Sequence, residues 1–147
     1  MITSTPVALL LRQRRLRPAT NAGFTLVEIM IVVAIIGLIA ALAVPGLIRA
    51  RKRTQATAIL NELRLIDSAM DQYALEYGKK NGDIITMAAW QLYIKPATRL
   101  YETGKDIFGA TYGDQTLGEL PPVPASSYDA LFSVADTSFW APYIKGP

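Results

Sequence analysis

Hydrophobic side chains follow two different patterns along the chain. Residues 24–48 are apolar almost without interruption, and Glu28 is the single charged residue among them. From residue 54 the apolar positions recur every three or four residues, at Ile59, Leu63, Ile66, Met70, Tyr73 and Tyr77. The first pattern predicts a helix that is long enough to span a membrane, and the second predicts an amphipathic helix with one buried face.

Together the two patterns predict one helix over residues 24–77. At 1.5 Å per residue such a helix is about 80 Å long, which is too long for the interior of a compact domain. Pro45 removes one hydrogen bond inside it and Gly46 follows, so we expect a kink or a loosened turn there. Lys79, Lys80, Asn81 and Gly82 are typical of a helix end.

Residues 82–147 contain frequent glycine and proline and only short apolar runs. They predict a short helix at residues 87–94 that begins at Thr86, strands at residues 98–101, 110–112 and 128–134, and an extended loop at residues 120–124. We therefore expect an α+β fold, in which a long N-terminal helix carries a small C-terminal antiparallel sheet.

Charge is distributed unevenly. The net charge of +3 hides four arginines in residues 1–23 without any acid, whereas residues 54–147 hold 7 basic and 11 acidic residues. Binding to nucleic acid needs clustered cations, so the acidic distal part argues against it. The chain has neither cysteine nor histidine, which excludes disulfides, thiolate sites and the usual general base, and we expect no enzyme.

Three interpretations of the apolar run remain open. A simple membrane anchor, with a head that binds a ligand and never assembles, explains its length and the basic flanks but not Glu28. A secretory signal cut after Ala43, at the pattern Ala41-Leu42-Ala43, would release a soluble binding domain. The third interpretation starts from Gly23, Phe24 and Glu28, which stand immediately before the long apolar stretch.

Gly23-Phe24-Thr25-Leu26-Val27-Glu28, followed by the apolar run with Pro45 near its end, resembles the start of type IV prepilins and of type II secretion pseudopilins. The resemblance implies a leader at residues 1–23, cleavage between Gly23 and Phe24 by a prepilin peptidase, and methylation of the new amine. It also implies insertion in the inner membrane with the head outside the cytoplasm, and a surface or periplasmic filament. The implied partners are copies of itself, other pilin-like subunits, an assembly platform and its ATPase.

This interpretation gives Glu28 a role. The amine freed at Phe24 is mostly protonated at neutral pH, and a carboxylate in a medium of low dielectric needs such a partner. We expect Glu28 to pair with the amine of a neighbouring subunit and so to set the register of assembly. Gly37 and Ala41 allow close approach of helices, and in the resembling pili the region of Pro45 can melt on assembly.

The predicted division of the chain is a leader at 1–23, a transmembrane and assembly segment at 24–53, and a head at 54–147 whose helical part is 54–78. Four cations follow the apolar run, and they are expected to flank the membrane and reach lipid phosphates: Arg49, Arg51, Lys52 and Arg53.

Metal binding is expected to be absent. Asp106-Ile107-Phe108-Gly109-Ala110-Thr111-Tyr112 weakly resembles a turn of pseudopilins, some of which bind calcium in a later loop, so Asp106 and Asp114 are weak candidates. Solvated loop acids are the favoured interpretation. We expect the aromatic residues near the C-terminus, Phe139, Trp140 and Tyr143, to pack in a small core, with an exposed adhesive surface as the alternative.

Overall fold

The computed structural model describes residues 23–147, so the predicted leader and its arginines lie outside the described residues. By internal contacts the chain divides into two units, Met1–Leu38 and Ile39–Pro147. The boundaries predicted at residues 23 and 53 follow processing and function rather than contacts, and they stay a prediction.

The first described element is the helix α1, Leu26–Tyr77, which has 52 residues. Its assignment continues through Pro45, so the expected loosening does not end or divide the helix. Its apolar N-terminal part, up to Ile48, has no buried residue. Within the described residues, one helix is long and apolar enough to cross a membrane, and it is this one.

Helix α1 ends at a glycine that the sequence analysis overlooked. Gly78 adopts a left-handed conformation with φ of 61°. The N–H of Lys79 donates to the carbonyl of Ala74 at 3.0 Å, which closes the last turn in a Schellman arrangement. The helix therefore ends one residue before the predicted basic stretch.

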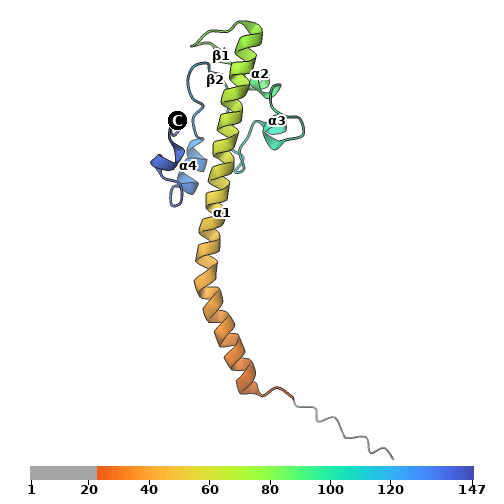
Figure 1. Cartoon of the computed structure of the whole chain (residues 1–147), viewed down its shortest axis with the longest axis vertical. Helices are drawn as coiled ribbons and strands as arrows, with labels where there is room; N and C mark the ends of the chain where they lie inside the picture. The colour runs from red at the N-terminus through yellow and green to blue at the C-terminus, as the bar shows by residue number, and fades with distance from the viewer. Residues whose placement is uncertain (1–22) are drawn as a thin grey trace, which may run out of the picture. The chain divides into compact units, whose positions relative to one another are not determined.

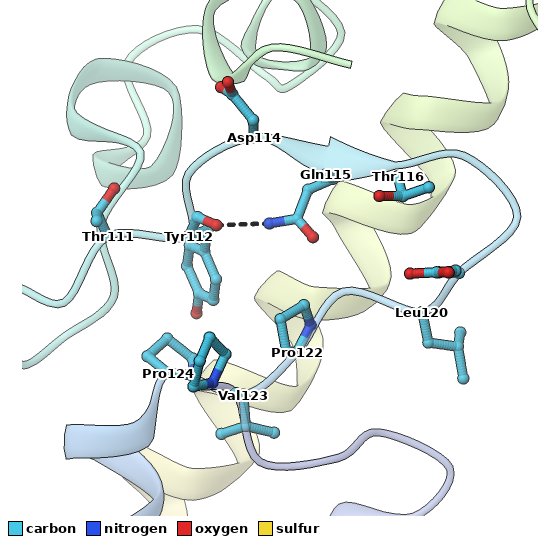
Figure 2. A pocket seen from close by; sticks show the side chains of 12 residues that line it. Thr111, Tyr112, Asp114, Gln115, Thr116, Leu120, Pro122, Val123 and Pro124 are labelled. Atoms are coloured by element: carbon cyan, nitrogen blue, oxygen red, sulfur yellow. Dashed lines mark hydrogen bonds between the residues drawn. The ribbon is translucent and has the colours of Figure 1, made fainter. Parts of the chain in front are cut away.

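The sheet is smaller than expected. Strand β1, Ile84–Ile85, pairs antiparallel with β2, Gln115–Thr116, with Ile84 opposite Thr116 (Figure 1). Gln115 is buried, and its side-chain amide donates to the carbonyl of Tyr112 at 2.5 Å, which fixes the chain entering β2 (Figure 2). The fold is α+β, as predicted, with a minimal antiparallel sheet.

Two predicted strands are wrong, because their residues are helical. Residues 98–101 begin α3, Arg99–Thr103, where the Thr98 hydroxyl accepts from the N–H of Tyr101 and Gly104 ends the helix at φ of 61°. Residues 128–134 lie largely in α4, Ala125–Leu131. In both segments the aromatic and aliphatic side chains gave a strand pattern, but a capping threonine or a preceding proline set helical backbone instead.

The third predicted strand, residues 110–112, is reduced to an isolated bridge between Lys105 and Thr111. The short helix α2, Met87–Gln91, begins after Thr86 as predicted and ends three residues early. The side chain of Thr86 makes no capping bond. Instead, Oδ1 of Asp114 accepts from the N–H of Met87 at 2.8 Å.

The core of the second unit lies along the distal half of α1. The predicted stripe is buried from Ile59 to Met70, but Tyr77 is 58% exposed and stacks on Tyr73 instead. Trp90 and Trp140 are fully buried, and Tyr143 is 6% exposed. The expected aromatic core is therefore present; its fourth short helix, α5, is Thr137–Trp140.

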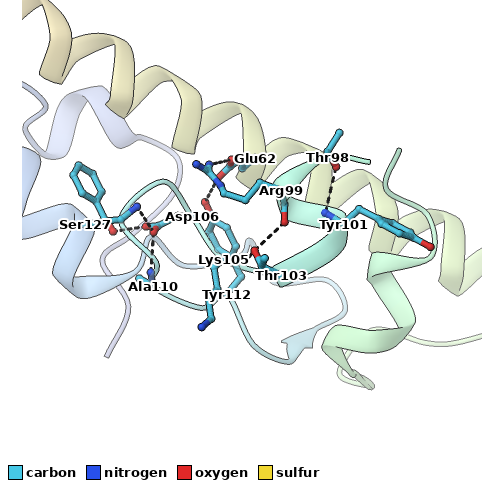
Figure 3. Close-up of polar contacts among 11 residues, drawn as sticks. Glu62, Thr98, Arg99, Tyr101, Thr103, Lys105, Asp106, Ala110, Tyr112 and Ser127 are labelled. Carbon is cyan, nitrogen blue, oxygen red and sulfur yellow. Dashed lines mark hydrogen bonds and ion pairs between the residues drawn. The ribbon is translucent and has the colours of Figure 1, made fainter. Parts of the chain in front are cut away.

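One polar contact ties the stretch between α3 and β2 to α1. Glu62 on α1 accepts from the hydroxyl of Tyr112 at 2.8 Å and pairs with Arg99 at 2.5 Å (Figure 3). Burial, followed by the charge and the hydrogen bond of Glu62, raises the pKa of the Tyr112 phenol above its ordinary value of 10.0. The phenol therefore stays protonated and keeps donating to the carboxylate.

We predict that Tyr112→Phe lowers the free energy of unfolding by about 1.5–3 kcal/mol, because a hydrogen bond to a charged group is lost. Urea denaturation in detergent, followed by the fluorescence of the buried Trp90 and Trp140, measures it. Tyr101→Phe is the control, since no hydrogen bond of its hydroxyl is recorded.

The same pair predicts a pH dependence. Above pH 10 the unfolded phenol ionises while the folded one does not, so the stabilisation is complete below this pH and declines as pH rises. The difference between wild type and Tyr112→Phe should shrink in alkaline buffer. A difference that grows there would contradict the assignment.

Candidate functional site

The predicted cleavage point lies in non-helical backbone before α1. Gly23, Phe24 and Thr25 are outside the helix and exposed, and the Phe24 side chain is 78% exposed. A Cβ placed on Gly23 would meet no other atom within 4 Å. The bond between Gly23 and Phe24 is therefore open to another protein.

Thr25 is a functional residue that the sequence analysis passed over. Its side-chain oxygen accepts from the N–H of Glu28 at 3.2 Å, and its carbonyl accepts from the N–H of Ile29 at 3.2 Å. Thr25 is thus the N-cap of α1 and Glu28 the third helical residue, the spacing of a capping box. The pattern Thr-x-x-Glu in the sequence was the signal for it.

Glu28 lies exposed in the first turn of α1. A negative charge at this end of a helix is favoured by the helix dipole, typically by about 0.3–1 kcal/mol. This is a small gain beside the few kcal/mol that an ionised carboxylate costs in a membrane. The two ion pairs recorded within residues 23–147 join other residues, so Glu28 remains available to an outside cation.

The other predicted assembly residues, Gly37, Ala41 and Pro45, are all exposed on α1. A Cβ built on Gly37 meets nothing within 4 Å, so no part of this chain requires a glycine there. Neither observation tests their role in assembly, which stays a prediction.

Asp106, the first weak metal candidate, is 1% exposed and has both oxygens engaged by protein donors. Oδ1 accepts from the N–H groups of Phe108 and Ala110, each at 2.9 Å, and Oδ2 accepts from the hydroxyl of the buried Ser127 (Figure 3). The carboxylate therefore organises the turn at residues 106–110 and joins it to α4.

Asp114, the second candidate, lies at a hollow of about 320 Å³ (Figure 2). Its carboxylate is directed towards α2, where it caps Met87. Within residues 23–147, no three acidic residues gather as a metal site would require. The structure thus gives both candidates a structural task and does not bring them together.

Comparison with known proteins places the similarity at the N-terminus. Residues 19–44 match the family described as "Prokaryotic N-terminal methylation motif". This segment contains Gly23, Phe24 and Glu28, so the chain carries the prepilin-type motif that the sequence analysis identified.

The relatives are secretion and pilus proteins. The chain is 34% identical over 61 residues to type II secretion system core protein G of Klebsiella michiganensis, covering 42% of this chain and 43% of that protein. It is 40% identical over 56 residues to core protein G of Pseudomonas aeruginosa, covering 38% of this chain and 39% of that protein. It is 39% identical over 66 residues to type IV major pilin protein PilA of Myxococcus xanthus, covering 45% of this chain and 30% of that protein.

These matches confirm the resemblance to type IV pilins and type II secretion pseudopilins. The chain spans less than half the length of each of these relatives. No solved structure matches the chain significantly.

We predict that Asp106→Ala lowers the free energy of unfolding by about 2–4 kcal/mol, because it leaves two buried N–H groups and a hydroxyl without an acceptor. Asp114→Ala, which removes one exposed hydrogen bond, is the control and should cost about 1 kcal/mol. Both are measured by urea denaturation with and without calcium. Calcium stabilising the wild type, and not Asp106→Ala, would contradict the structural role of Asp106.

Proposed function

We propose that this chain is a structural subunit of a type IV pilus-like filament and has no enzymatic activity. The observation that carries the proposal is the combination of the methylation motif at residues 19–44 with an entirely exposed apolar helix behind it. The apolar helix and the relatives fit a precursor in the inner membrane, and the relatives support assembly with pilin-like subunits.

In this proposal a prepilin peptidase cuts between Gly23 and Phe24 and the amine of Phe24 is methylated, which keeps its charge. An inner-membrane platform and its ATPase then extract the subunit, with its head outside the cytoplasm. Packing against the helices of neighbouring subunits replaces lipid around the apolar helix. Small residues at Gly37 and Ala41 permit close approach, and Pro45 provides a place where the helix can adjust.

Glu28 sets the register. Its carboxylate pairs with the Phe24 amine of an adjacent copy, so a misaligned subunit leaves a charge unpaired in an apolar surrounding. The N-cap at Thr25 supports this role, because it holds the backbone of Glu28 in place without occupying its carboxylate.

The second candidate, a pseudopilin of a type II secretion system, rests on the core protein G relatives of Klebsiella and Pseudomonas. It uses the same processing and packing, and differs in making a short periplasmic filament. Electron microscopy of material shed from cells separates the two, because long fibres containing this chain support the pilus. A secreted domain cut after Ala43 is disfavoured, since Ala43 lies inside α1.

We predict that Glu28→Ala leaves the chain membrane-inserted but reduces filament yield roughly tenfold or more, because each subunit contact loses about 1.5–3 kcal/mol. Sheared filaments and membrane fractions are compared by immunoblotting. Glu28→Gln should fail similarly, since it keeps the shape and loses the charge.

Asp71→Ala is the matched control, because Asp71 is an exposed acid elsewhere on α1. Its yield should equal that of the wild type. Normal filaments from both Glu28 variants would remove the register role.

A further inference from the structure

The second unit contains a sharp change of surface along α1. Residues 39–48 expose large apolar side chains, including Leu42 at 77% and Leu47 at 70%. Four cations follow at once, at Arg49, Arg51, Lys52 and Arg53. An apolar helix surface that changes to arginine and lysine within one turn is typical of the boundary between hydrocarbon and lipid headgroups.

A distal segment of the chain is fastened to this boundary. Nζ of Lys52 donates to the carbonyl of Ala130 at 3.5 Å, and Nη1 of Arg53 donates to the carbonyl of Val134 at 2.5 Å. The Arg53 guanidinium also lies 4.1 Å from the centre of the Phe139 ring. The blue segment that carries α4 accordingly lies beside the yellow part of α1 (Figure 1).

Between the two fastened carbonyls, Phe132 presents its ring to the outside. It is 56% exposed, although Tyr128 lies 5.9 Å away, centre to centre. With Arg53 and Phe139 it lines an open hollow of about 460 Å³. Phe132 and Phe139 thus form an aromatic surface beside the cations, which is the composition of interfacial membrane contacts.

The height of this surface along α1 matches the headgroup layer. Lys52 follows Ile48 by four residues, which is about 6 Å along the helix. The polar region on each side of a bilayer is about 5–8 Å thick. The segment at residues 130–134 is therefore held at the level of the headgroups when Ile48 lies at the edge of the hydrocarbon.

Charge favours the same occupant. Two acids lie near this segment, and both are engaged: Asp129 pairs with Lys145 at 2.8 Å, and Asp136 accepts from the hydroxyl of Ser138 and the N–H of Phe139. The four cations of α1 outnumber them, so an anionic phospholipid surface is attracted.

We propose that residues 130–134, with Phe132 foremost, dock into the phospholipid headgroup layer and hold the head against the membrane before assembly. This rests on the proposed function only in requiring that α1 inserts in a membrane. Phe132 contributes apolar area at the interface, and the cations contribute attraction to phosphates.

The absence of cysteine in the sequence makes a direct test simple. Single-cysteine full-length chains, Phe132→Cys and Ser133→Cys, are labelled with an environment-sensitive fluorophore. They are placed in phosphatidylethanolamine/phosphatidylglycerol vesicles at less than one chain per vesicle. Ser133→Cys keeps the phenylalanine. Quenching by a lipid with a nitroxide on its headgroup is then measured.

Leu92→Cys is the matched control. Leu92 is also apolar and 71% exposed, but its neighbour Tyr93 donates to Glu76. Glu76 lies 24 residues beyond Lys52, or about 36 Å along α1. Unchanged circular dichroism and Trp fluorescence establish that each variant keeps its fold.

We expect the labels at positions 132 and 133 to be quenched severalfold more than the label at position 92, and this excess to fall when phosphatidylcholine replaces all anionic lipid. Equal quenching at all three positions in an inserted chain would overturn the inference. Quenching at positions 132 and 133 that needs several chains per vesicle would do so too, because a second copy would then be the occupant. Failure of the chain to float with vesicles after alkaline extraction would instead contradict the proposed function.

Discussion

The structure depends on an apolar helix surface that the described chain does not cover. Sixteen large apolar side chains between Phe24 and Ile48 are exposed, each by roughly half or more. Leaving one such side chain in water instead of burying it costs about 1.5–3 kcal/mol. Lipid or the helices of other subunits must therefore surround this segment, and the rest of the molecule is arranged around that requirement.

The distal half of α1 solves the opposite problem. It buries Ile59, Leu63 and Ile66 beneath a head with very little regular sheet. A head built from short helices and turns needs other ties, and buried carboxylates supply them. Glu62 holds Tyr112 and Arg99 to α1, and Asp106 closes its own turn and reaches Ser127 on α4. Such networks are stabilising only when complete, and no buried side-chain donor or acceptor within residues 23–147 is left unsatisfied.

Hydrophobic patterning predicted the parts that are long and periodic. The helix, its buried stripe, the motif around Gly23, Phe24 and Glu28 and the aromatic core followed from it. The head was predicted less well because its segments are short. Residues 98–101 and 128–134 have strand-like composition, but local capping at Thr98 and the turn after Pro124 decided their backbone.

The candidate site was partly readable from sequence. The cleavage and assembly residues came from the motif, whereas the capping bond at Thr25 was overlooked although its spacing was visible. The fastening of residues 130–134 to Lys52 and Arg53 joins positions about eighty residues apart. No local pattern reveals such a contact, because it depends on the tertiary packing of the head on α1.

The central claim is that the apolar helix is kept and begins at a new, charged terminus. The most direct test is the intact mass and N-terminal sequence of the protein from its native host. The account predicts a chain that starts at Phe24 and is heavier by one methyl group. A mature chain that starts after Ala43, or one that retains residues 1–23, would contradict it.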